Sequence, residues 1–177
     1  MIVLREGSSE VETLLIERTV REEDPASGHV AFPGGRTQAD DPDLAATAVR
    51  ELEEEVGLTA TDLAGAPVYV GTDFATAFSM RIGIFAAALA PTGRRASVSS
   101  PREVAHVFWL PRSSLTTTRR MTRETRVGPR EVEATVYGAH VLWGFTRRVL
   151  LRFFEFPTPD PANPHDPSIS RHSPLRT

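Results

Sequence analysis

Hydrophobic and polar positions divide the chain into short strand-like runs and two longer helical segments. Ile2 to Arg5 and Val11 to Glu17 are apolar-rich runs on either side of Glu6-Gly7-Ser8-Ser9, a pattern that predicts a β-hairpin. Thr19 to Gly28 is polar and contains Pro25, which predicts a loop. Further strands are predicted at residues 30–32, 66–70, 80–90, 104–110 and 131–137.

Two helices are expected. The first is predicted to begin near Asp41, because Asp41 suits the N-cap and Pro42 the first helical position, and to end at Gly57. The second is predicted over Ala139 to Phe156, where apolar residues recur near helical spacing. Mixed strands with two substantial helices imply an α/β or α+β sandwich. Residues 157–177 include six prolines and few apolar side chains, so we expect a disordered tail after a folded domain of residues 1–156.

Composition excludes several function classes. With 177 residues and 40% apolar residues the chain suits one folded domain, and its net charge of -3 argues against a general nucleic-acid binder. It has no cysteine, and all 20 basic residues are arginine, so thiolate chemistry, Cys-ligated metals and lysine Schiff bases are ruled out. The longest apolar run, Ile82 to Ala90, is too short to span a membrane, and no signal peptide is evident, so we expect a cytoplasmic location.

The most informative segment is the acidic end of the first helix. At about 100° per residue, Glu51, Glu54 and Glu55 share one face, whereas Glu53 points the opposite way. Arg50 is four residues before Glu54 and can pair with it. A solvated acidic face is one interpretation. The other is a binding site for a hard divalent cation, which takes several carboxylate oxygens and completes its shell with water.

A glycine turn precedes this helix and favours the second interpretation. Phe32-Pro33-Gly34-Gly35 reads as a strand end followed by a tight turn without side chains at its tip. Bare glycines let backbone groups approach a metal ion or a phosphate closely. A strand, a glycine turn and an acidic helix would therefore bring backbone and carboxylates to one place.

These residues resemble the signature of the nudix hydrolases. Arg50 to Leu58, Arg-Glu-Leu-Glu-Glu-Glu-Val-Gly-Leu, matches the second half of the family motif at every specified position. The interval from Gly35 to Arg50 is one residue longer than in the motif, and the early glutamate of the family has no direct match. Asp41 or Asp43 is its nearest substitute, and we expect a catalytic role for neither.

The resemblance implies a nudix-type α/β/α sandwich with a mixed sheet and the Mg²⁺- or Mn²⁺-dependent hydrolysis of a nucleoside diphosphate linked to another group. It implies that Glu54 and Glu55 are metal ligands, that Glu51 is a ligand or the base, and that Arg50 orients the glutamates. The carbonyl of Gly35 is a further candidate ligand. Gly34, Gly35 and Arg36 are candidate substrate-binding residues.

A second signature resembles the coenzyme A diphosphatase branch of the family. Leu14 to Thr19, Gly28 and Phe32-Pro33-Gly34-Gly35 match its ends, although the interval from Thr19 to Gly28 is one residue too long. Trp143 to Arg147 is also similar to that branch. Arg18 would bind the 3′-phosphate or the diphosphate of coenzyme A. The alternative is that Arg18 is an ordinary surface charge. ADP-ribose, NADH or a nucleotide sugar is the alternative substrate, and a non-catalytic nucleotide sensor is the alternative outside enzymes.

Weaker signals concern three other regions. Glu103, just before the strand at 104–110, is a candidate additional acid or base, with an ordinary loop glutamate as the alternative. His29 adjoins the glycine turn and is a candidate phosphate contact or a solvated residue. The arginines of residues 119–130 form a predicted basic loop that would attract a polyanionic substrate, with RNA as a less favoured partner. The predicted partner is a small nucleotide diphosphate, without nucleic acid or membrane, and the chain is a candidate homodimer.

Overall fold

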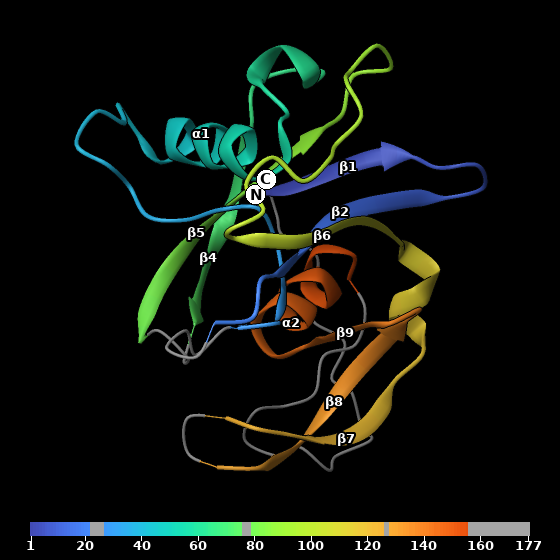
Figure 1. Ribbon diagram of the computed structural model, residues 1–177. Helices are drawn as coiled ribbons and strands as arrows, with labels where there is room; N and C mark the ends of the chain where they lie inside the picture. Colours follow the sequence, from blue (N-terminus) through green and yellow to red (C-terminus); the bar gives the residue numbers. More distant parts are fainter. Residues whose placement is uncertain (22–26, 76–78, 126–127, 156–177) are drawn as a thin grey trace.

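The computed structural model describes residues 1–21, 27–75, 79–125 and 128–155, and the predicted tail at 157–177 lies outside this part. The described residues form two β-sheets and two α-helices (Figure 1). The larger sheet is mixed, because its strand β1 pairs antiparallel with β2 and parallel with β5. Its six strands are β1 (Ile2–Glu6), β2 (Val11–Arg18), β3 (Val30–Ala31), β4 (Val68–Ala75), β5 (Met80–Ala88) and β6 (Val104–Pro111). The predicted α+β class with a mixed sheet is therefore confirmed.

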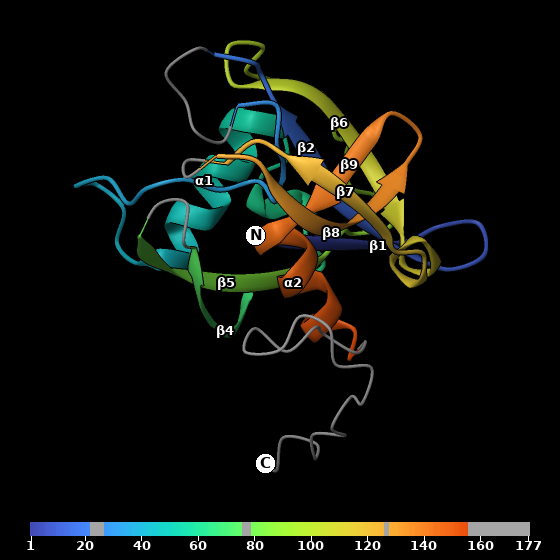
Figure 2. The ribbon, with the colours of Figure 1, turned by 90° about the horizontal axis from the view of Figure 1, so that it is seen from below.

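The smaller sheet follows in the sequence and packs against the larger one, where the His140 ring of β9 stacks on the Phe108 ring of β6 at 3.8 Å (Figures 1 and 2). It has three antiparallel strands in sequential order, β7 (Arg119–Arg123), β8 (Arg130–Tyr137) and β9 (His140–Trp143). The helices are α1 (Leu44–Val56) and α2 (Gly144–Phe153), with short 3-10 helices η1 (Ala60–Asp62) and η3 (Arg112–Thr116). None of the helices in the described ranges is long and apolar enough to cross a membrane.

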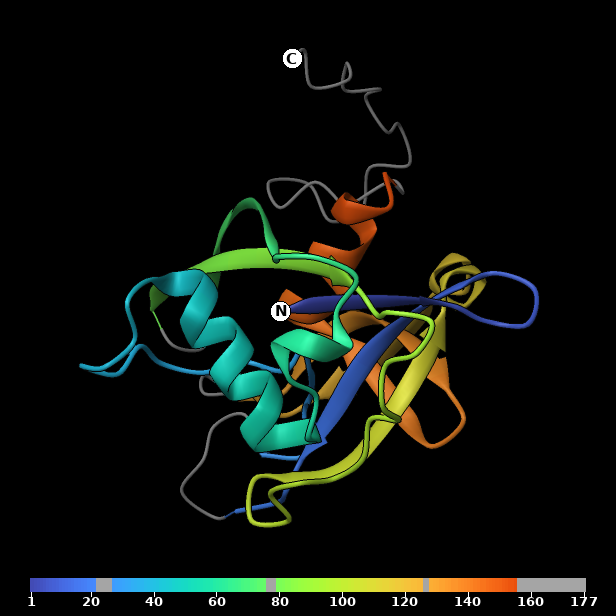
Figure 3. The same cartoon turned by 90° about the horizontal axis from the view of Figure 1, so that it is seen from above.

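Alternating side chains of β2 build two cores. Leu14 and Ile16 pack into a cluster with Leu52 of α1. Leu15, which points the other way because side chains alternate along a strand, packs into a second cluster with Leu150 of α2. All of these side chains are fully buried. Helices α1 and α2 thus lie on opposite faces of the larger sheet, and α2 also packs against Leu142 of β9 in the smaller sheet (Figures 1 and 3).

Helix α1 has defined caps at both ends. The side chain of Asp43 accepts a hydrogen bond of 2.7 Å from the backbone N–H of Ala46, which makes Asp43 the N-cap. The predicted N-cap, Asp41, is wrong, because Asp41 lies in the preceding loop and binds Arg50 instead. Gly57 ends the helix as predicted. It has the left-handed φ of 73° that glycine tolerates best, and its N–H donates to the carbonyl of Glu53.

The predicted second helix is too long at its N-terminal end. Residues His140–Trp143 form strand β9, which pairs with β8 across the tight turn at Gly138, and α2 begins only at Gly144. Val141 and Leu142 fit a strand as well as a helix, since short apolar runs are ambiguous in period. The helix ends at Phe153 and not at Phe156.

Two other elements differ from the prediction. The segment predicted as a basic loop contains strand β7, so arginines alternate between the two sides of a β-hairpin. Strand β4 covers Val68–Ala75 and continues past Gly71, whereas the prediction placed its end at Val70. The pairing of β4 with β5 shifts register between Tyr69 and Gly71, so Val70 is an extra residue in a bulge next to the glycine.

Candidate active site

The acidic face of α1 turns partly into the protein. Glu55 is 2% exposed and Glu51 is 9% exposed, whereas the side chain of Glu54 is 49% exposed. Glu53 is exposed to solvent on the other side of the helix. This arrangement follows from the packing of Leu52 and Val56, because their burial fixes the rotation of the helix about its axis. The helix therefore carries two buried carboxylates and a third, half-exposed one on the same side.

The glycine turn lies directly against these carboxylates. The backbone N–H of Gly34 donates a 2.9 Å hydrogen bond to Oε2 of Glu55. A Cβ atom added to Gly35 would lie 2.5 Å from the carboxyl carbon of Glu51, so a larger residue here would force the carboxylate or the turn to move. Gly34 has a φ of 152°, in the region that favours glycine. The backbone nitrogen of Met1 donates to the carbonyl of Pro33 and holds the start of the turn.

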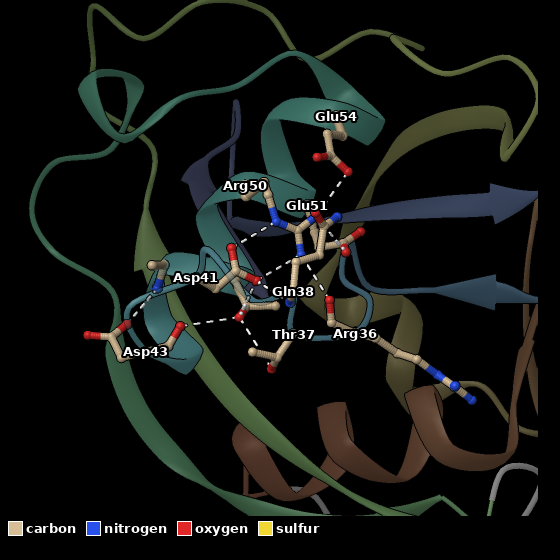
Figure 4. Close-up of polar contacts among 10 residues, drawn as sticks. Arg36, Thr37, Gln38, Asp41, Asp43, Arg50, Glu51 and Glu54 are labelled. Carbon is tan, nitrogen blue, oxygen red and sulfur yellow. Dashed lines mark hydrogen bonds and ion pairs between the residues drawn. The ribbon is translucent and has the colours of Figure 1, made fainter.

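Arg50 connects the loop, the helix and the acidic face (Figure 4). Its Nη1 donates to Oε1 of Glu51 at 2.9 Å and to Oε2 of Glu54 at 3.0 Å. Its Nε and Nη2 bind the two carboxylate oxygens of Asp41 at 2.9 and 3.0 Å. Asp41 also accepts a hydrogen bond from the hydroxyl of Thr47 at 2.9 Å, one turn along α1 from the N-cap. The guanidinium is therefore fixed relative to both Glu51 and Glu54.

Burial dominates the ionisation of the two inner carboxylates. It raises the pKa of Glu55 to about 7, against the opposing effects of the Gly34 N–H and the charge of Arg18. Burial also raises the pKa of Glu51, while Arg50 opposes the shift and the charges of Glu54 and Glu103 add to it. Negative charge is thus costly at both positions, and a cation placed beside them would lower that cost.

Arg18 and Glu103 are among the charged residues that influence the pKa values of Glu55 and Glu51. Arg18 ends β2 close enough to Glu55 for its charge to lower the pKa of that carboxyl. Glu103 lies close enough to Glu51 to raise the pKa of Glu51. The carbonyl of Glu103 accepts a hydrogen bond of 2.9 Å from the N–H of Thr19, the residue after Arg18. Two candidates from distant parts of the sequence therefore flank the same acidic face.

Arg36 has a different orientation. Its carbonyl accepts a 2.9 Å hydrogen bond from Nη2 of Arg50, but its side chain extends away from the carboxylates (Figure 4). Its guanidinium is exposed and is available to a ligand that enters from that side.

The site offers carboxylates without enclosing a metal ion completely. Within the described residues, no three His, Cys, Asp or Glu side chains surround a common point closely enough to hold an ion by themselves. Mg²⁺ seldom needs such a cage, because it usually binds one or two carboxylates and completes its shell with water and substrate phosphates. The donor set of Glu51, Glu54, Glu55 and the Gly35 carbonyl is compatible with that mode of binding.

Asp41 contacts the candidate site through Arg50, and this contact was not predicted from the sequence. Five residues separate it from Gly35, which is the interval between the glycine and the early glutamate of the nudix motif. The additional residue of this chain therefore lies between Asp41 and Arg50. This spacing is the feature of the sequence that could have pointed to Asp41. The structure shows that Asp41 accepts a hydrogen bond from Arg50.

Comparison with known proteins agrees with this geometry. The sequence profile of the NUDIX domain matches residues 1–132. An uncharacterized Nudix hydrolase NudL of Yersinia pestis (strain Pestoides F) is 47% identical over 49 residues, which are 28% of this chain and 25% of that protein. The match thus spans a quarter of the length of that curated relative. NudL of Yersinia pseudotuberculosis serotype O:1b has the same identity over the same length.

A solved structure extends the likeness to most of the fold. The MutT protein from Methanosarcina mazei Go1 superposes with a TM-score of 0.57 at 17% identity, covering 87% of this chain and 88% of that one. The profile covers well over half of the chain and includes the glycine turn, α1, Arg18 and Glu103. The chain belongs to the NUDIX domain family.

Proposed function

We propose that this protein hydrolyses a nucleoside diphosphate linked to another group, with Mg²⁺ or Mn²⁺ as cofactor. The observation that carries the proposal is the placement of Glu51, Glu54 and Glu55 on one side of α1, against the Gly34–Gly35 turn and oriented by Arg50. Two buried carboxylates that resist ionisation gain most from a divalent cation. All three glutamates are present, which favours catalysis over a non-catalytic nucleotide sensor.

Each residue has a proposed role. Glu51, Glu54, Glu55 and the carbonyl of Gly35 would hold the metal, which supplies charge neutralisation at the diphosphate and activation of water. Glu51 or Glu54 accepts the proton of the attacking water as its oxygen bonds to phosphorus and the bridging P–O bond breaks. Glu103 is a second candidate for this base, since it lies near Glu51. Arg50 positions the glutamates.

Arg18 is proposed to bind the diphosphate itself. Its charge lowers the pKa of Glu55, one of the proposed metal ligands, and this supports a role at the diphosphate over a role at a remote group of the substrate. Gly34, Gly35 and Arg36 would line the same part of the site, with the exposed Arg36 guanidinium contacting the substrate from outside. Arginine is well suited to this role, because its planar fork can donate two parallel hydrogen bonds to a phosphate.

We propose coenzyme A or acyl-coenzyme A as the substrate. The two ends of the coenzyme A diphosphatase signature act on the same carboxylate, because Gly34 of the glycine turn donates a hydrogen bond to Glu55 and the charge of Arg18 lowers the pKa of Glu55. ADP-ribose, NADH or a nucleotide sugar is the alternative substrate class. Cytoplasmic location, dimerisation and the domain boundary at residue 156 remain predictions from the sequence.

The test is a hydrolysis screen with the metal-stripped chain. Coenzyme A, ADP-ribose, NADH, dinucleoside polyphosphates and nucleoside triphosphates are each supplied with Mg²⁺, with Mn²⁺ or with excess EDTA. We expect metal-dependent turnover that is fastest with coenzyme A. Faster hydrolysis of ADP-ribose or NADH would replace the proposed substrate, and full turnover in EDTA would refute the proposed metal chemistry. Nucleotide binding without turnover on any substrate would favour a sensor.

A further inference from the structure

Three arginines lie on one face of the β7–β8 hairpin. Strands β7 and β8 pair antiparallel, with Arg119 opposite Ala134, Met121 opposite Val132 and Arg123 opposite Arg130. Because side chains alternate along a strand, these partners all project from the same side. We call Arg119, Arg123 and Arg130 the hairpin arginines.

The pairing of Arg123 with Arg130 is electrostatically unfavourable. Like charges directly opposite each other destabilise an antiparallel pair. No acidic side chain in the described ranges forms an ion pair with either arginine. The other face of the hairpin differs, since Arg120 is opposite Glu133. The hairpin arginines therefore concentrate positive charge that an anion would neutralise.

Aromatic rings continue this face toward the active site. Trp143 of β9 is opposite Ala134, on the same side of the sheet, and the Arg123 guanidinium lies 5.9 Å from the centre of its ring. The His29 ring approaches the Trp143 ring edge-on at 4.9 Å. The carbonyl of His29 in turn accepts a 3.0 Å hydrogen bond from the N–H of Arg18. A continuous path of contacts thus leads from the hairpin to the arginine beside Glu55.

We propose that two of the hairpin arginines, Arg123 and Arg130, bind a phosphate monoester of the nucleotide substrate, separate from the diphosphate that is cleaved. This inference rests on the proposed function and assigns different phosphates to different arginines. Arg18 takes the diphosphate near Glu55, and Arg123 and Arg130 take the second, remote phosphate. Guanidinium groups on adjacent strands suit a phosphate monoester, whose oxygens accept several charge-assisted hydrogen bonds. The half-buried rings of Trp143 and His29 form an aromatic edge between the two sites, beside which the nucleoside would lie.

Binding of two adenosine nucleotides tests the proposal without requiring turnover. Adenosine 3′,5′-bisphosphate carries a second phosphate monoester that adenosine 5′-monophosphate lacks. We expect the Arg123→Gln/Arg130→Gln variant to bind the bisphosphate about 10-fold or more weakly, the loss typical of a charge-assisted hydrogen bond. Its affinity for the monophosphate should change by less than about threefold, as for a neutral surface substitution. Titration calorimetry measures both constants on the full chain.

Two matched variants control for charge and fold. Arg120→Gln removes an arginine from the opposite face of the same strand and should leave both affinities unchanged. Arg123→Lys/Arg130→Lys keeps both charges and should retain the preference for the bisphosphate. Equal weakening of both nucleotides by Arg123→Gln/Arg130→Gln, or an equal loss in Arg120→Gln, would overturn the proposal. Displacement of the bisphosphate by a single-stranded oligoribonucleotide of higher affinity would also overturn it and identify an RNA surface.

Kinetics separate this inference from the proposed function. With coenzyme A and 3′-dephospho-coenzyme A as substrates, the glutamine double variant should raise KM for coenzyme A alone and keep kcat. If no substrate is hydrolysed but the bisphosphate preference depends on Arg123 and Arg130, the proposed function fails and the anion site stands. If coenzyme A is hydrolysed with the same KM by wild type and the glutamine double variant, the anion site fails and the proposed function stands.

Discussion

Asp41 binds Arg50 through both carboxylate oxygens, at 2.9 Å from Nε and 3.0 Å from Nη2. The same guanidinium donates to Glu51, Glu54 and the carbonyl of Arg36. An arginine has five N–H donors, and here each one has an acceptor. The pKa of Asp41 is accordingly held well below its ordinary value, mainly by Arg50. Asp41 therefore fixes the guanidinium that contacts Glu51 and Glu54, two of the proposed metal ligands.

Asp41→Asn should lower kcat by about 10- to 100-fold, as the loss of a partner that supports a metal site usually does. The amide keeps the shape of the side chain but loses the charge and one of the two acceptors for Arg50. Asp43→Asn is the matched control, because asparagine caps a helix as well as aspartate does, and kcat should stay within about threefold. Steady-state kinetics of both variants on the best substrate decide the point. Equal losses would mean that Arg50 does not depend on Asp41.

Glu54→Gln and Glu55→Gln should each lower kcat by at least about 100-fold, since each removes a proposed metal ligand. Glu53→Gln is isosteric and adjacent in sequence but exposed on the other side of α1, so it should change kcat by less than about threefold. Turnover at saturating Mg²⁺ is the measurement. A similar loss in Glu53→Gln and Glu54→Gln would contradict the assignment of the helix face.

Gly35→Ala should abolish most activity while the protein stays folded. The new methyl group would meet the carboxylate of Glu51 at 2.5 Å, so the carboxylate or the turn must move. Gly65→Ala introduces the same change where no atom lies within 4 Å, and it should behave like wild type. Kinetics and thermal unfolding of both variants are compared. Normal turnover by Gly35→Ala would show that the close approach to Glu51 is not needed.

Arg18→Gln should lower kcat/KM by roughly 10- to 150-fold, equivalent to about 1.5–3 kcal/mol for a hydrogen bond to a charged group. The loss should be equal for coenzyme A and for 3′-dephospho-coenzyme A, because both contain the diphosphate that Arg18 is proposed to bind. A loss confined to coenzyme A would move Arg18 to the 3′-phosphate. No loss on either substrate would leave Arg18 outside the binding site.

Stability should depend on Asp62 in a defined pH range. Hydrogen bonds from Arg94 and from the backbone hold the pKa of this carboxyl far below its ordinary value of 3.8. Because the folded pKa is depressed, the stabilisation is complete above pH 3.8 and is lost as the pH falls toward the folded pKa. Asp62→Asn should therefore lower the melting temperature by several degrees at pH 7, and the difference from wild type should shrink below about pH 4.

Thermal unfolding of wild type and Asp62→Asn from pH 7 to pH 2.5 would measure this effect. Asp40→Asn, in the exposed loop before α1, serves as the control and should show little difference at any pH. A constant gap between Asp62→Asn and wild type across the pH range would mean that the charge of Asp62 does not contribute.

Local sequence patterns predicted the part of the site that lies on one element. The glutamate face of α1 and its end at Gly57 follow from helical periodicity and from the left-handed conformation of glycine. The β1–β2 hairpin follows from two apolar runs around a polar turn. In each case the information lies within a few consecutive residues.

Features that depend on distant partners were predicted less well. Strand β9 exists because His140–Trp143 pairs with β8, and nothing within those four residues distinguishes a strand from the first turn of a helix. Arg119 and Arg123 were predicted to lie in a loop because apolar and polar residues do not alternate clearly in their arginine-rich segment. The segment nevertheless forms a strand, because it pairs with β8. The position of Asp41 depends on a loop that folds back onto α1. Such contacts depend on the whole fold.

The central position of β1 has a consequence for synthesis on the ribosome. Its parallel partner β5 begins at Met80, 78 residues after Ile2, so the chain must grow for roughly 4–16 s at about 5–20 residues per second before the sheet can close. During that interval β1 has one open edge, and α1 lacks Phe85, which belongs to the cluster that covers its apolar side. An unpaired edge of this kind invites association with other chains. A ribosome that stalls before Met80 would thus expose a nascent chain that carries the glutamate helix without the strand that completes its packing.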